Sequence, residues 1–156
     1  MTPDVVSRLR SGLNADELAA VETLDRRRLE LERSRVPAKT AAHITEPLYG
    51  VFACLKMWQR LVRDMEEEWS RTSSYMVYEY LNDLTVRDSI DEYLAAMPPS
   101  LQEKVEHIVS DLDGRYQAVT VEDGGAELAL YRSRLAGGRE ICWWWARKSR
   151  VFPPGW

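Results

Sequence analysis

Three consecutive tryptophans, Trp143, Trp144 and Trp145, are the residues whose type and spacing most suggest a binding surface. Tryptophan is large and amphipathic, and it is enriched in binding hot spots. If the segment is a β-strand, Trp143 and Trp145 share one face and Trp144 takes the other. Cations follow the cluster, so the pattern predicts a partner-binding surface made of Trp144, Arg147, Lys148 and Arg150. The alternative is structural, with Trp143 and Trp145 packed on the body of the protein and Trp144 against the Pro-rich tail.

A second candidate surface lies mid-chain, where tyrosines occur beside acidic residues. Tyr75 and Tyr80 are expected toward the surface and, with Asp83, would form an aromatic, acidic face suited to a basic protein partner. The alternative is partial burial of the rings with their hydroxyls in water. We therefore take Tyr75, Tyr80 and Asp83 as candidate partner-binding residues.

Patterns for metal binding are weak. Glu103, His107 and Asp111 recur every four residues on one predicted helix. This row lies about 140° from the apolar face of that helix, so it should point to solvent. The stretch from Asp111 to Glu122 begins like a calcium loop, but the glycine required at the sixth position is missing. We predict no metal site and no cofactor.

Catalytic patterns are weak as well. Cys54 flanks a predicted apolar stripe and Cys142 lies in an aromatic segment, so both read as packing residues. An enzyme would need a deep pocket where several of Cys54, His43, His107 and Asp111 converge. We predict no catalytic residue. Two cysteines are also too few for a disulfide framework, which favours the cytoplasm. The N-terminus has no secretion signal, and no stretch is apolar enough to span a membrane.

Charge is distributed unevenly along the 156 residues, whose net charge is −4. Residues 131–156 carry six positive charges against Glu140 alone, which leaves residues 1–130 at about −9. Such a basic end can be a binding tail. It can equally be folded against the acidic helices as an internal electrostatic match.

Hydrophobic periodicity predicts helices over most of the chain. A short helix from Asp4 to Leu9 ends near Gly12, and Asn14 caps the next one with Glu17 in capping-box position. After a connection around residues 36–40, the strongest stripe follows a cap at Thr45, with members at alternating spacings of three and four. They are Leu48, Val51, Leu55, Trp58, Val62, Met65 and Trp69. This seam suits packing within one bundle or homodimerisation, so the oligomeric state stays open.

The next apolar stripe, from Val77 to Leu84, is rotated by about half a turn relative to the one from Ile90 to Met97. The rotation predicts two short helices with a break near Thr85. Ser100 then opens a further helix with a capping box, and Gly114 weakens that helix near its end.

The sequence changes character after residue 125. Residues 128–135 and 140–146 flank a glycine turn at 136–139 and predict a β-hairpin, although the first arm is also compatible with helix. Prolines extend the tail at 151–156. The expected fold is mainly α, a helical bundle of about four or five helices with a small C-terminal β-hairpin and an extended Pro-rich tail. We expect one domain, 1–156, with a helical body at 1–125 and the hairpin and tail at 126–156.

The hypothesis that fits best is a non-enzymatic cytoplasmic protein-interaction module. An inhibitor of the immunity-protein or antitoxin type, or a scaffold, would have this acidic, helical character. The alternative is single-stranded nucleic-acid binding through the Arg- and Trp-rich C-terminal segment, in which Trp144 would stack on bases. Neither hypothesis involves a membrane.

Overall fold

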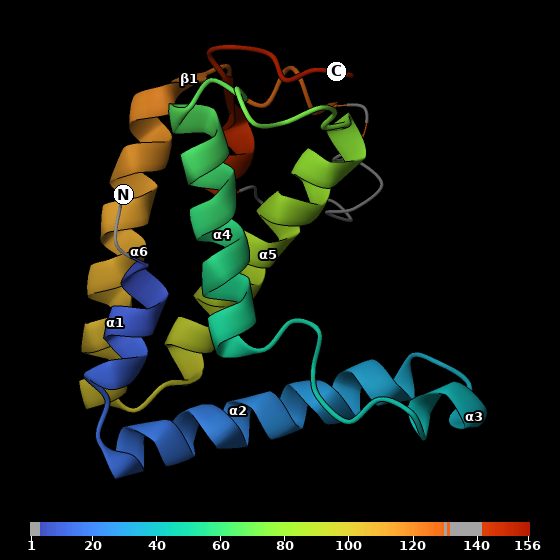
Figure 1. Cartoon of the computed structure of the whole chain (residues 1–156), viewed down its shortest axis with the longest axis vertical. Coiled ribbons are helices and arrows are strands. Elements are labelled where there is room, and N and C mark those ends of the chain that lie inside the picture. The colour runs from blue at the N-terminus through green and yellow to red at the C-terminus, as the bar shows by residue number, and fades with distance from the viewer. Residues whose placement is uncertain (1–3, 130, 132–141) are drawn as a thin grey trace. The chain divides into compact units, whose positions relative to one another are not determined.

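The computed structural model describes residues 4–129, 131 and 142–156. As predicted, these residues are mainly helical, with a small antiparallel strand pair near the C-terminus (Figure 1). In chain order, the elements are α1 (Val5–Ser11), α2 (Ala15–Ser34), α3 (Ala38–Ala41), α4 (Val51–Glu66), α5 (Val77–Ala96), α6 (Pro99–Val119), β1 (Thr120–Glu122), the 3-10 helix η1 (Trp143–Ala146) and β2 (Arg147–Ser149). None of the helices in these ranges has the length and apolar character needed to cross a bilayer.

The chain forms two compact units. Unit 1 comprises Met1–Met57 and Ser89–Asp111, and unit 2 comprises Trp58–Asp88 and Leu112–Trp156. The boundaries between the units fall inside α4, α5 and α6. The expectation of one domain with a separate C-terminal part stays a prediction.

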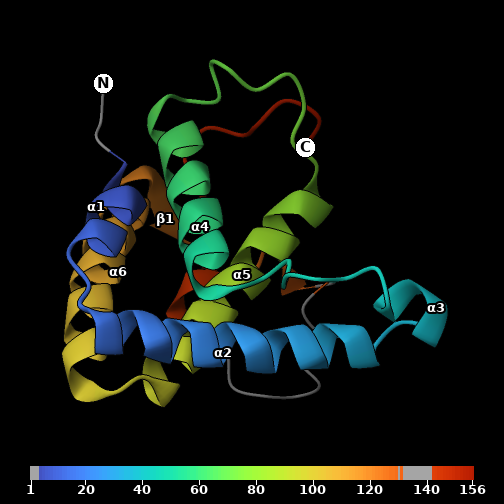
Figure 2. The same cartoon turned by 60° about the horizontal axis from the view of Figure 1, so that its bottom comes forward.

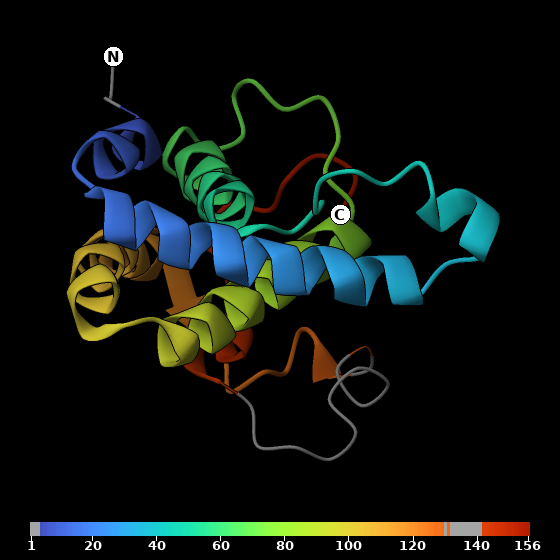
Figure 3. The same ribbon diagram turned by 90° about the horizontal axis from the view of Figure 1, so that it is seen from below.

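The first two helices of unit 1 begin with side-chain caps, of which only the one at Asn14 was predicted. The Asp4 carboxylate accepts the backbone N–H of Val6 at 3.0 Å, and α1 ends at Gly12. At the start of α2, Asn14 and Glu17 form the expected capping box, because each side chain accepts the backbone N–H of the other residue. Helix α1 lies alongside the first half of α6 (Figures 1 and 2). The segment predicted as a connection contains α3, which lies beside the C-terminal end of α2 (Figure 3).

The start of α4 differs from the prediction. The helix begins at Val51, six residues after the expected cap at Thr45. Two carboxylates of α2 bind the backbone N–H groups that precede or open α4. Glu32 accepts from Leu48 at 2.7 Å, and Asp25 accepts from Val51 at 2.8 Å. These backbone N–H groups, which have no acceptor within α4, are therefore bound by side chains of α2. A local sequence pattern cannot reveal an acceptor that lies on another helix.

Helix α5 is continuous, so the predicted break near Thr85 is wrong. The Thr85 hydroxyl donates to the carbonyl of Leu81 within the same helix, at 2.9 Å. The rotated stripes have another cause. Leu81 and Leu84 belong to the core of unit 2, whereas Ile90 and Met97 belong to the core of unit 1. One helix serves two cores, and its apolar face changes direction accordingly.

Helix α6 is also longer than expected. It begins at Pro99, a residue type favoured in the first turn, and it continues through Gly114 to Val119. The Ser100 hydroxyl does not form the predicted capping box. It donates instead to Glu17 Oε2 at 2.5 Å, within unit 1.

The strand pair of unit 2 joins distant segments. Thr120 pairs with Ser149, and Glu122 pairs with Arg147, in antiparallel register. The predicted turn at 136–139 lies outside the described residues. The predicted strand at 140–146 is corrected in its described part, because Trp143–Ala146 form a 3-10 helix. In the described part of the first arm, Ala129 and Tyr131 are helical, as the alternative for that arm allowed.

The Pro-rich tail packs against the loop between α4 and α5 (Figures 1 and 2). The Trp69 indole donates to the carbonyl of Val151 at 2.9 Å, and the backbone N–H of Tyr75 donates to that of Pro154 at 2.7 Å. These contacts place the tail beside Tyr75, just before the start of α5.

Candidate protein-interaction site

The side chains of Trp143, Trp144 and Trp145 do not alternate between two faces as they would in a β-strand. Trp144 and Trp145 are both buried, at 4% and 6% exposure, whereas Trp143 is 38% exposed. Both buried indoles donate to Asp88 Oδ1, Trp144 at 2.7 Å and Trp145 at 2.9 Å. Trp144, a predicted partner-binding residue whose burial the sequence left open, is therefore buried. The 3-10 turn brings two successive side chains toward one carboxylate, whereas a strand would have separated them.

A charged network surrounds Trp144. The Arg87 guanidinium lies 4.0 Å from the centroid of the Trp144 ring and forms a two-pronged ion pair with Asp113. Asp113 also accepts the indole N–H of Trp58 at 3.1 Å. These contacts make the cluster part of the interior of unit 2. Asp88, Arg87 and Asp113 were not among the predicted site residues, although buried indole N–H groups need acceptors and this need points to nearby carboxylates.

The three predicted cations of the C-terminal segment have different surroundings. Arg147 is half-buried, and its guanidinium donates to Thr120 Oγ1 at 2.8 Å. Lys148 is half-buried and lies 5.9 Å from the centroid of the Phe152 ring, whereas Arg150 is exposed. Arg147 thus holds β1 and β2 together, and the cations do not form a patch with Trp144.

Tyr75 and Tyr80 are buried, at 8% and 0% exposure, so the expectation that they lie toward the surface is wrong. The Tyr80 hydroxyl lies 2.6 Å from that of Tyr116 and 2.9 Å from the carbonyl of Arg147. Desolvation raises the pKa of both Tyr80 and Tyr116, so both hydroxyls stay protonated. These tyrosines connect α5 and α6 to the C-terminal segment, and their side chains are not available to a partner in this structure.

Asp83, the third residue of that predicted set, lies beside a groove. The groove measures about 500 Å³ and lies between the parts of α4 and α5 that belong to unit 2. The polar and charged residues that line it include Arg60, Asp64, Tyr78, Glu79, Asn82 and Asp83. Tyr78 is 64% exposed and Asp83 is 7% exposed, so the former is at the rim and the latter at the base.

The Asp83 carboxylate is only partly satisfied. Its Oδ2 accepts a hydrogen bond from the Tyr75 hydroxyl at 2.6 Å. Among the described residues, no Lys or Arg forms an ion pair with Asp83, and no donor binds its Oδ1. Burial is the main reason that the pKa of Asp83 rises to about 6, and the Tyr75 hydrogen bond opposes the rise. Perturbed carboxyl groups in clefts are common at functional sites, which makes this groove the best candidate.

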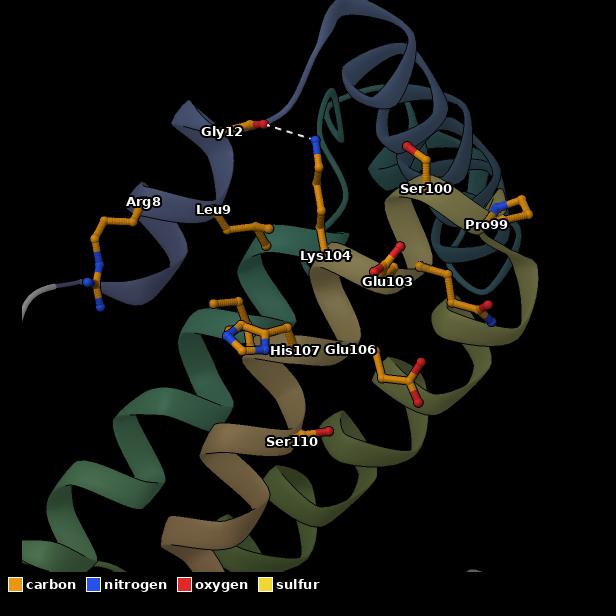
Figure 4. A pocket seen from close by; sticks show the side chains of 12 residues that line it. Arg8, Leu9, Gly12, Pro99, Ser100, Glu103, Lys104, Glu106, His107 and Ser110 are labelled. Carbon is orange, nitrogen blue, oxygen red and sulfur yellow. Dashed lines mark hydrogen bonds between the residues drawn. The ribbon is translucent and has the colours of Figure 1, made fainter.

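A second pocket, of about 1080 Å³, lies in unit 1 beside α1 and α6. Figure 4 shows that Arg8 and Glu106 point to opposite sides and that Lys104 reaches the carbonyl of Gly12. His107 is exposed, in agreement with the prediction that its row faces solvent. This pocket contains both signs of charge, and we find no convergent set of side chains in it.

Metal and nucleophile chemistry find no support in the described residues. No group of three or more His, Cys, Asp or Glu side chains there could hold a metal ion. Residues 111–119 belong to helix α6, so this stretch does not form the loop that calcium binding would require. Cys54 is fully buried, and desolvation raises the pKa of its thiol to about 12, which leaves it protonated and inert.

Comparisons with known protein families, with curated proteins and with solved structures found no match to this chain. The function of this protein is therefore inferred from the chemistry of the site itself.

Proposed function

We propose that this protein is a cytoplasmic protein-interaction module that binds a basic partner through the acidic groove of unit 2. An inhibitor of the immunity-protein or antitoxin type is one such module, and a scaffold is another. The groove borders the acidic, tyrosine-bearing helix α5, which is the element that sequence analysis selected for this role.

Asp83 is the observation that carries the proposal. A buried carboxylate normally has a cationic partner or several hydrogen-bond donors, because removing its charge from water is costly. Raising its pKa from 3.8 to about 6 means that folding disfavours the charged form by about 3 kcal/mol. A cation from a partner would remove much of this penalty. Features that cost stability within one chain are often retained for function.

The rim of the groove has the residue types that protein interfaces use. Tyr78, which lines the groove, is 64% exposed, and Met76, two residues earlier in the chain and outside the groove lining, is 52% exposed. Tyr78 also contacts Tyr131 edge-on, with 5.8 Å between the ring centroids, which limits the freedom of its ring. Tyrosine and methionine are enriched at interfaces, and a ring that is already held in place loses less entropy on binding.

The charge of the groove favours a basic partner. Asp64, Glu79 and Asp83 line it against Arg60 alone. Three carboxylates and one guanidinium leave a negative groove that would steer a positively charged surface and repel acidic ones.

Nucleic-acid binding, the alternative, has less support. Its stacking residue, Trp144, is buried, and Arg147 is engaged with Thr120. In the described part of the C-terminal segment, Lys148 and Arg150 remain as cations near an exposed Phe152, whereas Arg132 and Arg134 lie outside the described residues. We therefore propose protein binding ahead of it.

Site-specific photo-crosslinking in living cells tests the proposal. The crosslinking amino acid p-benzoylphenylalanine replaces Tyr78 at the groove, or exposed Gln117 on α6 as the control. We expect a discrete protein adduct from the Tyr78 site that is absent from the Gln117 site and resists nuclease.

Two charge variants show whether the groove itself is responsible. Asp64→Asn removes a carboxylate that lines the groove, whereas Glu67→Gln removes an exposed one from the turn that follows α4. Only Asp64→Asn should weaken the adduct at position 78. Equal adducts at positions 78 and 117, or equal effects of the two variants, would contradict the proposal, and an adduct lost on nuclease treatment would support the nucleic-acid alternative.

A further inference from the structure

We propose that the groove receives one arginine side chain of the partner, whose guanidinium pairs with Asp83 at the base. This inference depends on the proposed function and gives it a chemical specificity. It also assigns different tasks to the two ends of the groove: the rim contacts the partner's surface, and the base recognises a single charged group.

The two oxygens of Asp83 are in different states. Tyr75 occupies Oδ2 with a 2.6 Å hydrogen bond, which fixes the orientation of the carboxylate. Oδ1 receives no donor from the described residues, and it is not one of their fully enclosed polar atoms, so solvent reaches it from the groove. The side chain as a whole is 93% buried, as its 7% exposure indicates. One oxygen of this nearly buried carboxylate can therefore accept a hydrogen bond from a partner.

Three further charged groups face Asp83. Glu79 lies one helical turn before it on α5, while Asp64 and Arg60 lie on α4. Glu79 and Asp64 both raise the pKa of Asp83, and Arg60 lowers it without forming an ion pair. A second cation would relieve the repulsion among the three carboxylates, and this charge complementarity is the reason for choosing a cationic occupant.

Arginine fits this setting better than lysine. A guanidinium is more weakly hydrated than an ammonium, so it enters a desolvated site at lower cost, and its several N–H donors can reach Asp83 Oδ1 and a neighbouring carboxylate together. The exposed Tyr78 ring on the groove wall gives its planar face a surface for stacking.

Binding by this route depends on pH, because the pair needs the ionised carboxylate. With burial and the neighbouring Glu79 and Asp64 opposing ionisation, Asp83 is about half charged near pH 6. The arginine side chain should therefore bind well above pH 7 and poorly at pH 5, where about one carboxylate in ten is ionised.

The test uses the whole protein and two capped tripeptides that differ by one atom group. The probe is acetyl-Gly-Arg-Gly-amide, and the control is the same peptide with citrulline, a neutral isostere of arginine. Nuclear magnetic resonance follows the Asp83 side-chain carboxyl. We expect the arginine peptide to lower the apparent pKa of Asp83, to bind about tenfold more weakly at pH 5 than at pH 7.5, and to bind at least tenfold more tightly than the citrulline peptide at pH 7.5.

Two variants distinguish recognition from a structural role. Asp83→Asn keeps the size of the side chain and an acceptor for Tyr75, and it should abolish the preference for arginine over citrulline. Tyr75→Phe removes the hydrogen bond that lowers the pKa of Asp83, so the pH midpoint of arginine binding should move upward while binding persists. A purely structural pair would not show this displaced midpoint.

The outcomes separate this inference from the proposed function. If crosslinking at position 78 depends on Asp64 while arginine and citrulline peptides bind equally, the module stands and the arginine pocket is wrong. If the arginine peptide binds in an Asp83-dependent way while no protein adduct forms at position 78, the pocket stands and the proposed module is wrong. Arginine binding that survives unchanged in correctly folded Asp83→Asn would also overturn the inference.

Discussion

The indole N–H of Trp145 points at the carboxylate of Asp88, 2.9 Å from one oxygen and 3.1 Å from the other. The same carboxylate accepts the indole of Trp144 at 2.7 Å. One acidic residue of α5 therefore anchors the 3-10 helix η1 to the core of unit 2. The C-terminal segment is therefore held against α5 by two neutral indoles.

Removing this anchor should destabilise the protein. Asp88→Ala leaves two buried indole N–H groups without their charged acceptor, so we expect a loss of about 3 kcal/mol in the free energy of unfolding. Glu92→Ala, an exposed position on the same helix, should cost less than about 0.5 kcal/mol. Urea unfolding followed by tryptophan fluorescence measures both, and equal effects would contradict the anchoring role.

The tryptophans of η1 should differ sharply in their contribution to stability. Trp144→Ala removes a buried ring and should cost about 3–5 kcal/mol. Trp143→Ala removes a ring that is 38% exposed and should cost about 1–2 kcal/mol. Thermal and chemical unfolding of the two variants give the comparison. A larger cost for Trp143 would mean that the strand-like orientation is the correct one.

Asp83 should make stability decrease as the pH rises. The pKa of its carboxyl is about 6 in the folded protein and near 3.8 when unfolded, so the folded state holds more protons between these values. Asp83→Asn removes this dependence. We expect the variant to match the wild type near pH 4 and to exceed its stability by up to about 3 kcal/mol at pH 7.5.

The control for this prediction is Glu67→Gln, which changes an exposed carboxylate. Its difference from the wild type should stay within about 0.5 kcal/mol at both pH values. A stability difference for Asp83→Asn that does not grow with pH would show that the carboxylate is not desolvated as the structure indicates.

Glu17, in unit 1, should make stability increase as the pH rises, which is the opposite of the effect of Asp83. Hydrogen bonds from the Asn14 backbone, Lys104 and Ser100 lower the pKa of Glu17 from 4.5 to about 2. A lowered pKa stabilises the fold above the unfolded value, and that stability is lost as the pH falls from about 4.5 toward 2. The destabilisation caused by Glu17→Gln should therefore be largest above pH 4.5 and shrink in acid. Unfolding curves at pH 3 and pH 6 check this, with exposed Glu106→Gln as the control.

The early helices were predictable because their signals are local. The Asn14–Glu17 capping box involves residues three positions apart, and the structure has both of its hydrogen bonds. The heptad-like stripe likewise identified α4, and its members Leu55, Trp58 and Val62 are buried. Asp83 was also among the predicted site residues, although the sequence assigned it to an open face.

Predictions failed where the partner is distant in sequence. The start of α4 is set by Asp25 and Glu32, which lie on another helix. The apparent break at Thr85 arises because α5 contributes to two cores, and no local pattern separates that case from two helices.

The sequence by itself determined the helical character, the caps of the first helices and the acidic nature of α5, because spacing and capping act within a few residues. Only the tertiary structure decided that Trp144 is buried on Asp88 and that Asp83 lies at the base of a groove. Burial and charge pairing depend on which segments meet in space. The contact between Asp88 and Trp144, for example, joins residues 56 positions apart.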